Sequence, residues 1–467
     1  MKMWSGRFRQ PLDPAFERWQ RSFPFDRRLL GEEVAASRAH AAALGKAGVL
    51  SPEEAQSILE GLDRLQKDVE ADPSLLDDPS AEDVHHFVEE QLVARIGETG
   101  YKLHSGRSRN EQIATDLRLF TRGSVDAIRA ALAELIAAFV EKARAQGAAA
   151  MPAYTHLQRA EPVLVAHWLL AYVEMFFRDA DRLADCRKRA NVLPLGSGAV
   201  AGSTLPLDRA AMARELGCEG VSANSLDVTC DRDFALEFVN ALSLLALHLS
   251  RLAEEMTLFA TAEYGFVRLP EPYSTGSSAL PQKKNPDSME LLRAQIGRVS
   301  GASVSLLVAM KGLPLAYNKD LQEMQAPLFA AVDAIREALP IAAGFVRQVE
   351  FDKERMQQAA GSSFMNALSA ANYLVRRGVP FRRAHAVIGE AVQLCLEKGC
   401  ALDGLSLEEL RQLNPEFGPD FSECLTLEAS LAAHDIPGGT APARVQTALK
   451  VAEQRLAVFE EASHARA

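Results

Sequence analysis

Cysteine is scarce in this sequence, and its few residues are scattered. The 467 residues include six cysteines, and no two of them form a CxxC pair. A zinc knuckle needs such pairs, and a disulfide framework needs a denser cysteine pattern. The sequence therefore predicts a protein of a reducing compartment that has neither of these stabilising devices.

The sequence also lacks a membrane-spanning stretch and an excess of positive charge. The N-terminus MKMWSGRFRQPLDP has no apolar run after its charges, and the one long uncharged stretch, 191–207, is rich in Gly, Ser and Pro. A membrane span needs roughly 18 or more apolar residues. The net charge of -11 disfavours contact with phosphate backbones and anionic membranes. We expect neither a membrane nor a nucleic-acid partner.

Nucleotide-binding glycine motifs are missing as well. There is no GxGxxG after a strand and no GxxxxGK[ST]. The chain is 48% hydrophobic and 24% charged, which is typical of a folded soluble protein. Its length favours two to four domains.

Long helical segments dominate what the sequence does contain. A helical region over 32–70 includes Ser51-Pro52, an N-cap followed by proline in the first turn. Helices far longer than the average of about 11 to 12 residues are predicted elsewhere, the first with a break near Gly123. They cover 110–145, 163–189, 233–261, 289–310 and 322–345. Because their apolar residues cover more than one face and strand signals are scarce, we predict a mainly α fold whose central bundle associates with other copies.

The segment 274–291, STGSSALPQKKNPDSMEL, has the most informative composition. Gly276 allows mobility, and Asn285 and Pro286 are residues that start helices. Lys283 and the positive helix end would then face the same space and form an anion site. The alternative is a mobile surface loop before a helix.

Two further segments carry polar residues at predicted helix ends. PAYTHLQRAEP, 152–162, places Thr155 and His156 in a loop between long helices, where His156 is either a catalytic acid or base or a hydrogen-bonded structural residue. HSGRSRNEQIATDLRL, 104–119, offers Ser108, Arg109 and Asn110 where a helix begins. Arginine beside amides suits carboxylate binding, although a capping segment with solvated arginines has the same composition.

A fourth segment, LAYNKDLQE at 315–323, adds Tyr317 and Gln322 in another loop that leads into a helix. Such loops on a rigid scaffold are where sites are usually built. A metal site is not predicted, because the adjacent His85 and His86 point about 100° apart on a helix and no carboxylate set accompanies them.

These four segments, in this order, resemble the fumarase and aspartase superfamily and, within it, the argininosuccinate lyase family, to which delta crystallin of the lens is related. The resemblance runs from WSGRF at 4–8 to GGTAPARV at 438–445. GSSALPQKKN resembles the superfamily signature GSSxMPxKxN, with Leu280 in place of Met, a volume-conserving exchange. The strings SGRSRN, THLQRAxP and YNKDLQE narrow the resemblance to the family.

The resemblance implies three helical domains, 1–106, 107–358 and 359–467, with a long central bundle. It implies a homotetramer whose active sites are each built from three subunits. The implied activity is the reversible elimination of argininosuccinate to fumarate and L-arginine, the last step of arginine biosynthesis, in the cytoplasm and without metal or cofactor.

By position, the resemblance also implies the site residues. Ser277 matches the catalytic serine, His156 its acid–base partner, and Lys283 a group on the reacting carboxylate. The matching substrate-binding residues are Asn285, Ser108, Arg109, Asn110 and Thr155 for the fumarate half and Ser22, Asp26, Tyr317 and Gln322 for the arginine half.

The sequence departs from the family pattern at two places. Met324 and Gln325 stand where relatives usually carry Asp and Lys, and Gln20 and Arg21 differ near the N-terminal substrate segment. A charge-assisted hydrogen bond contributes roughly 1.5 to 3 kcal/mol. We therefore expect weaker substrate binding unless another cation replaces the missing lysine.

As a hypothesis for the reaction, Ser277 removes the proton and His156, directly or through a neighbour, protonates the departing guanidino nitrogen. The reverse assignment stays open. Alternatives to this activity are another lyase of the superfamily, acting on adenylosuccinate, aspartate or malate, a crystallin-like relative without turnover, and a purely helical binding scaffold.

Overall fold

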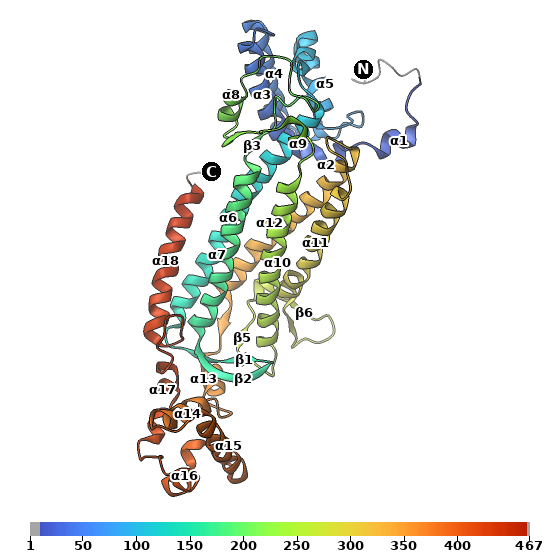
Figure 1. Ribbon diagram of the computed structural model, residues 1–467. Coiled ribbons are helices and arrows are strands. Elements are labelled where there is room, and N and C mark those ends of the chain that lie inside the picture. Colours follow the sequence, from blue (N-terminus) through green and yellow to red (C-terminus); the bar gives the residue numbers. More distant parts are fainter. Residues whose placement is uncertain (1–9, 465–467) are drawn as a thin grey trace. The chain divides into compact units, whose positions relative to one another are not determined.

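The computed structural model describes residues 10–464, so the WSGRF motif at 4–8 lies outside the described residues. The described chain is mainly helical, which confirms the predicted fold class (Figure 1). The long helices are α6 (Arg109–Gln146), α7 (Val165–Ala190), α10 (Asp233–Phe259), α11 (Asp287–Met310) and α12 (Gln325–Gln348). Their ends agree with the predicted ends to within three residues. Helix α6 is continuous through Gly123, so the predicted break there is wrong.

Shorter helices precede, separate and follow the long ones along the chain. They are α1 (Pro14–Trp19), α2 (Phe23–Asp26), α3 (Leu30–Lys46), α4 (Pro52–Ala71), α5 (Val84–Ile96), α8 (Arg209–Glu215), α9 (Ser225–Val228), α13 (Lys353–Ala360), α14 (Ala367–Arg376), α15 (Phe381–Lys398), α16 (Leu407–Leu413), α17 (Leu427–Ala432) and α18 (Pro442–His464). Helix α4 begins as predicted: Ser51 and Glu54 form a capping box.

The strands of the described residues are short and pair in twos. The pairs are β1 (Ala150–Thr155) with β2 (Gln158–Leu164), β3 (Val192–Leu193) with β4 (Gly220–Val221), β5 (Val267–Arg268) with β8 (Glu350–Phe351), and β6 (Thr275–Gly276) with β7 (Lys284–Asn285). The β1–β2 hairpin replaces the loop that was predicted around His156. Its residues include two prolines and several polar groups, so the alternation typical of a strand is weak in the sequence.

The described chain divides into two compact units. The first comprises Met1–Ile128, Asp181–Leu244 and Ile296–Ile335, and the second Arg129–Ala180, Leu245–Gln295 and Arg336–Ala467. Each of the long helices contributes residues to both units.

In the first unit, the long helices are tied to one another by aromatic and ionic contacts. The rings of Phe120 on α6 and Phe329 on α12 meet edge to face, with centroids 4.9 Å apart. Arg187 on α7 forms a two-pronged ion pair with Asp126 on α6, at 2.7 and 3.0 Å. The short helix α2 packs onto α5 through the stacked rings of Phe23 and Phe87.

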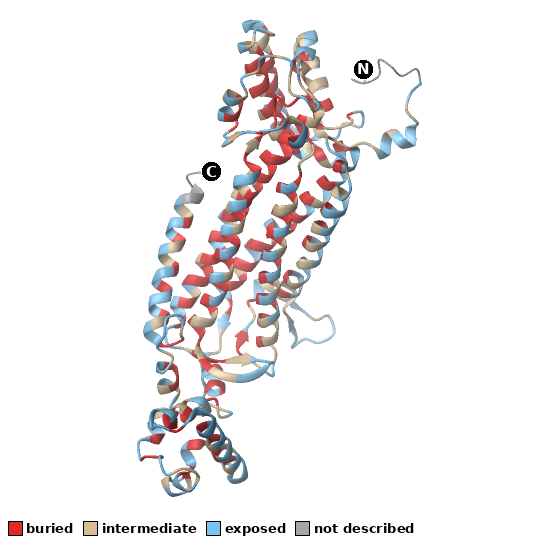
Figure 2. Cartoon of the chain, in the orientation of Figure 1, coloured by how far each residue is buried: buried red, intermediate tan, exposed pale blue. Residues whose placement is uncertain are grey.

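In the second unit, the same helices pack through a larger aromatic cluster. Phe139 on α6 contacts the rings of Tyr172 and Phe176 on α7. Glu255 on α10 accepts hydrogen bonds from Trp168 Nε1 at 2.7 Å and from the Tyr172 hydroxyl at 2.6 Å. Burial is concentrated along these helices (Figure 2). The predicted helical bundle is therefore confirmed.

Helix α10 is the one described helix that is long and apolar enough to cross a membrane. More than half of its apolar window, 56%, is buried inside the protein. A core helix of a folded protein has the same composition, so α10 gives only weak support to a membrane span.

Candidate active site

Six of the predicted site residues line one pocket of the first unit, a cavity of about 160 Å³. They are Ser22, Asp26, Arg109, Asn110, Tyr317 and Gln322. The remaining lining residues are Glu82, Asp83, His85, Ile113, Lys319 and Gln325. The pocket therefore combines carboxylates with cations and amides, as a zwitterionic ligand requires.

Asp26 is the most perturbed carboxyl group in this pocket. It ends helix α2, where it is 1% exposed, and it accepts a 3.0 Å hydrogen bond from the backbone N–H of Val84. Burial, together with the nearby charge of Asp83, raises the pKa of Asp26 to about 7. Asp26 therefore changes its charge near neutral pH.

Arg109 enters the pocket from the start of helix α6. Ser108 caps this helix, because its Oγ accepts from the Asn110 N–H and its own N–H donates to Glu111 Oε1. The Arg109 guanidinium lies 3.0 Å from a carboxylate oxygen of Asp83. The alternative of a capping segment with solvated arginines is therefore correct for Ser108, which caps the helix. It is wrong for Arg109, which is a paired, largely buried cation.

Tyr317 and Gln322 reach the pocket from the turn before helix α12. Ala316, beside Tyr317, has a φ of 70°, a left-handed conformation that non-glycine residues seldom adopt. The Gln322 amide donates a 3.1 Å hydrogen bond to the backbone oxygen of Gln20. Because the acceptor is a backbone atom, the unusual side chain at position 20 does not affect this contact.

Arg21, the other unusual residue near the N-terminus, is directed at the backbone. It donates to the carbonyl oxygens of Ala81 and Asp78, at 2.9 and 3.2 Å. It therefore braces the loop before helix α5.

Gln325, which stands where relatives usually carry Lys, lines the same pocket. Its side chain is buried, and its amide oxygen Oε1 has no hydrogen-bond partner among the described residues. Lys319 also lines this pocket. It is a cation, and it belongs to the YNKDLQE string that resembles the family.

Thr155 and His156 lie in the second unit, at the tip of the β1–β2 hairpin. Thr155 pairs with Gln158, so His156 and Leu157 form a two-residue turn. Both have positive φ, 55° and 57°, although neither is glycine. Such conformations cost about 1 to 3 kcal/mol each and are concentrated at functional sites.

Ser277, Lys283 and Asn285 also lie in the second unit, Ser277 and Lys283 on the loop that joins β6 to β7 and Asn285 in β7 itself. Ser277 Oγ accepts hydrogen bonds from the N–H groups of Ala279 and Leu280, at 3.3 and 3.1 Å. Asn285 pairs with Thr275 in the small sheet and its side chain donates to the Gly276 carbonyl oxygen, so the prediction that Asn285 caps helix α11 is wrong. Helix α11 begins two residues later, at Asp287.

Comparison with known proteins identifies the family. A model described as "Lyase" matches residues 6–301, and one described as "Argininosuccinate lyase C-terminal" matches residues 364–432. The argininosuccinate lyase of Koribacter versatilis (strain Ellin345) is 58% identical over 464 residues, which are 99% of each chain. The chain belongs to the argininosuccinate lyase family. The family resemblance noted in the sequence is thereby confirmed, and the protein is a lyase.

Further relatives agree with this assignment. The argininosuccinate lyase of Acidobacterium capsulatum is 58% identical over 460 residues, covering 97% of this chain and 95% of that protein. Among solved structures, EDDS lyase in complex with formate has a TM-score of 0.87 at 27% identity, covering 98% of this chain and 93% of the other.

A buried polar cluster of this lyase lies behind the pocket. His85 Nδ1 is 2.9 Å from Glu33 Oε2 and 3.6 Å from Asp116 Oδ2. These three residues are placed closely enough to hold a metal ion, so the argument that no carboxylates accompany His85 is wrong. The carboxylates come from helices α3 and α6 and are distant in the sequence.

The donors around Glu33 favour a hydrogen-bonded cluster over a cation site. Ser37 and Gln112 donate to Glu33 Oε1 at 2.6 and 3.0 Å, and the Arg107 guanidinium is 3.7 Å from the same oxygen. A metal ion would compete with these donors and with the positive charge of Arg107.

Other pocket residues of the lyase were not predicted from the sequence. Glu82 and Asp83 precede helix α5, where Asp83 accepts from the His86 N–H at 2.7 Å and caps the helix. The acidic pair before a helix was a visible signal, but it is also an ordinary N-cap composition. Arg232 is not among the residues that line the pocket: it is fully buried, and its guanidinium donates to the Asp231 backbone oxygen.

Proposed function

We propose that this lyase catalyses the reversible elimination of argininosuccinate to fumarate and L-arginine. The observation that carries the proposal is the charge pattern of the first-unit pocket. Asp26 and Asp83 supply carboxylates, and Arg109 and Lys319 supply cations, around one small cavity. The arginine part of argininosuccinate carries an ammonium and a carboxylate and therefore needs both kinds of partner.

The electrostatic demand of the reaction supports the proposed roles in the second unit. Removing a proton beside a carboxylate creates a second negative charge, so cations and fixed donors must meet it. A Lys283 ammonium about 4 Å away would contribute about 4 kcal/mol at an effective dielectric of about 20. Asn285 would add a fixed donor. Interactions that are stronger in the intermediate than in the substrate accelerate the step.

Ser277 is our candidate base and His156 our candidate acid, with the reverse assignment kept open. The two backbone N–H groups that point to Ser277 Oγ support the serine role, because such donors stabilise an alkoxide. The exposed hairpin turn at His156 gives that residue access to a ligand. In this scheme Ser277 takes the proton from carbon and His156 gives one to the departing guanidino nitrogen.

We further propose a homotetramer whose active sites each draw on three subunits. Exposed apolar side chains on the long helices support this association, because soluble monomers seldom expose contiguous apolar surface. They are Leu244 and Leu247 on α10 and Leu291, Val304, Leu307 and Val308 on α11. Thr155, His156 and Lys283 lie on exposed segments, where a neighbouring subunit can reach them.

We propose a cytoplasmic enzyme of arginine biosynthesis with three domains, 1–106, 107–358 and 359–467, that acts on a small molecule without metal or cofactor. The scattered cysteines, all six of them free, are consistent with a reducing compartment.

The function is tested by identifying both products by proton NMR after incubation with argininosuccinate. Fumarate and arginine should appear in equal amounts. Ser277→Ala and His156→Gln should each keep less than about a tenth of the turnover, because acid–base groups typically contribute about 10²- to 10⁴-fold. Ser57→Ala, on helix α4, is the matched control and should keep full activity. A Ser277→Ala enzyme with more than a tenth of wild-type turnover would refute the serine role.

A further inference from the structure

The hairpin that carries Thr155 and His156 adopts a conformation that its own sequence does not favour. Two-residue hairpin turns with positive φ at both positions are usually formed by Asn-Gly or Asp-Gly. Here the positions are filled by His156 and Leu157, and both side chains are exposed. Contacts outside the turn must therefore hold it in place.

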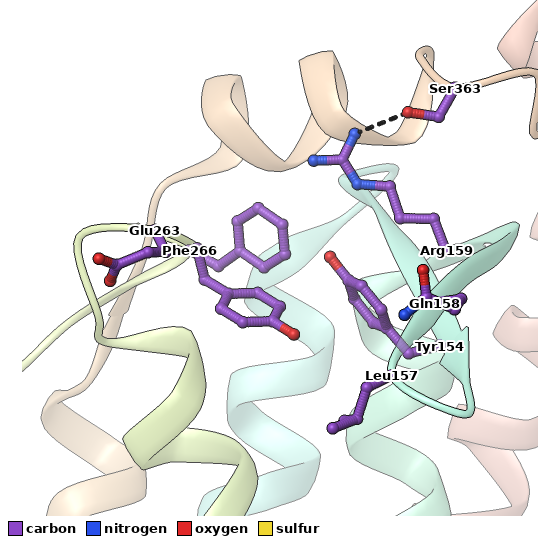
Figure 3. A pocket seen from close by; sticks show the side chains of 8 residues that line it. Tyr154, Leu157, Gln158, Arg159, Glu263, Phe266 and Ser363 are labelled. Carbon is purple, nitrogen blue, oxygen red and sulfur yellow. Dashed lines mark hydrogen bonds between the residues drawn. The ribbon is translucent and has the colours of Figure 1, made fainter.

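Arg159, the second residue after the turn, makes such contacts. Its Nη1 donates to Ser362 Oγ at 2.6 Å and lies 3.3 Å from Ser363 Oγ. Figure 3 shows the Arg159 side chain extending away from the hairpin to Ser363. The tip of the hairpin is thus tied to the segment that follows helix α13.

The segment that receives Arg159 is itself fixed. Ser362 Oγ donates to the carbonyl oxygen of Ala359, at 2.9 Å, near the end of α13. Ser363 and Phe364 both have positive φ, and the Phe364 ring packs against the core of the C-terminal helices. Arg159 therefore links two strained turns, one of which is anchored in a core.

Tyr154 anchors the other strand of the hairpin. It is the cross-strand partner of Arg159. Its ring packs against those of Tyr264 and Phe259, with centroids 5.5 and 6.3 Å apart. Tyr154 and Arg159 also line the cavity of about 420 Å³ shown in Figure 3, together with Phe266.

We propose that Arg159 is a positioning residue for the reaction: its bonds to Ser362 and Ser363, with Tyr154 as the opposite anchor, hold the hairpin turn so that His156 meets the substrate in one orientation. This inference rests on the proposed function of His156. Arg159 does not touch the substrate in this account. Its effect on the rate passes through the backbone of the hairpin.

Kinetics of three variants test the proposal. Arg159→Ala should lower kcat by at least about tenfold and change KM by less than about threefold, because small misplacements of a catalytic group cost up to about 10²-fold in rate. Arg159→Lys, which can donate to Ser362, should recover part of kcat. The double variant Ser362→Ala and Ser363→Ala should lower kcat in the same direction. Arg268→Ala, on an exposed arginine of the same unit, is the control and should leave kcat unchanged.

Hydrogen exchange tests whether Arg159 holds the hairpin, independently of the proposed function. In Arg159→Ala, the amides of 150–164 should exchange at least about tenfold faster than in the wild type, while the rest of the chain keeps its protection. This measurement does not depend on turnover. An inactive wild-type enzyme would refute the proposed function, and hydrogen exchange alone would then show whether Arg159 holds the hairpin.

Two outcomes would overturn the proposal. The first is unchanged exchange of the hairpin in Arg159→Ala. The second is loss of activity in Arg159→Ala combined with wild-type kcat in the variant that lacks both serine hydroxyls, which would mean that Arg159 acts on the substrate directly. If Arg159→Ala does not fold, the double serine variant and Arg159→Lys test the proposal in its place.

Discussion

His85 and Glu33 form a buried ion pair at the back of the candidate substrate pocket, with 2.9 Å between Nδ1 and Oε2. Burial alone would raise the pKa of Glu33, but the charges of His85 and Arg107 and the hydrogen bonds to Glu33 outweigh it and lower that pKa to about 2. Burial opposes the charged form of His85, yet the Glu33 charge prevails and raises the pKa of His85 above 6.5. Both residues are therefore charged in weakly acidic solution.

Glu33→Gln should destabilise the protein by about 3 to 5 kcal/mol, because it leaves a buried charge without its partner. The lowered pKa of Glu33 gives stability that is present above about pH 4.5 and is lost as the pH falls toward 2. The raised pKa of His85 gives stability that is present below pH 6.5 and is lost as the pH rises through its folded value. The difference from wild type should be largest between these limits, in urea unfolding at a series of pH values. The exposed Glu60→Gln on α4 is the control, and a variant that unfolds like the wild type would contradict the pair's role.

Asp26 should give the activity an inflection near pH 7. Its raised pKa means that the carboxyl is neutral below about 7 and charged above. If the carboxylate holds the cation of the arginine half, KM should rise as the pH falls below 7, with a smaller change in kcat. Asp26→Asn should keep, at every pH, the high KM that the wild type has at low pH, and it should lack this inflection. Superimposable profiles of kcat/KM for the two enzymes would show that Asp26 does not hold the substrate.

Gln325→Lys should restore the contact that relatives usually have. We expect KM for argininosuccinate to fall about tenfold, because a charge-assisted hydrogen bond contributes about 1.5 to 3 kcal/mol. Gln325→Leu, similar in size, is the control: it removes the unpaired amide oxygen without adding charge, so KM should not fall. An unchanged KM in Gln325→Lys would indicate that Lys319 or Arg109 already makes this contact.

The fold was largely predictable from the sequence, because long helices with wide apolar faces have a strong periodic signal. The break predicted at Gly123 is absent, and this shows the limit of reading helix ends from the sequence. Packing of a long helix on several sides outweighs the cost of one glycine, about 1 kcal/mol. The β1–β2 hairpin escaped prediction because its turn lacks glycine and is held by Arg159 and Tyr154, contacts that no local pattern reveals.

The candidate site was predictable where motifs carried it and not where partners come from distant segments. Asp26, Arg109 and Tyr317 were matched by position through the family resemblance, and the structure brings them to one pocket. The cluster of His85 was missed because its partners Glu33 and Asp116 lie on other helices. The pKa of Asp26 depends on burial and on Asp83, which only the folded chain brings near.

The apolar face of helix α11 should hold the oligomer together. Val304 and Val308 are one helical turn apart and are 60% and 63% exposed. Replacing both with Lys should reduce the mass in multi-angle light scattering from that of a tetramer to that of a smaller species, and should lower activity if sites are shared. Leu396→Lys, on an exposed leucine of helix α15, should leave the mass unchanged. A wild-type chain that runs as a monomer would contradict the tetramer outright.

Fumarate release from several substrates tests the central claim most directly. The purified protein is offered argininosuccinate, adenylosuccinate, aspartate and malate under identical conditions, and release is followed by absorbance. We predict rapid release from argininosuccinate and none above background from the other three. Release from one of the others in preference would contradict the proposed substrate, and silence on all four would contradict the proposed function and favour a structural relative that keeps the fold without turnover.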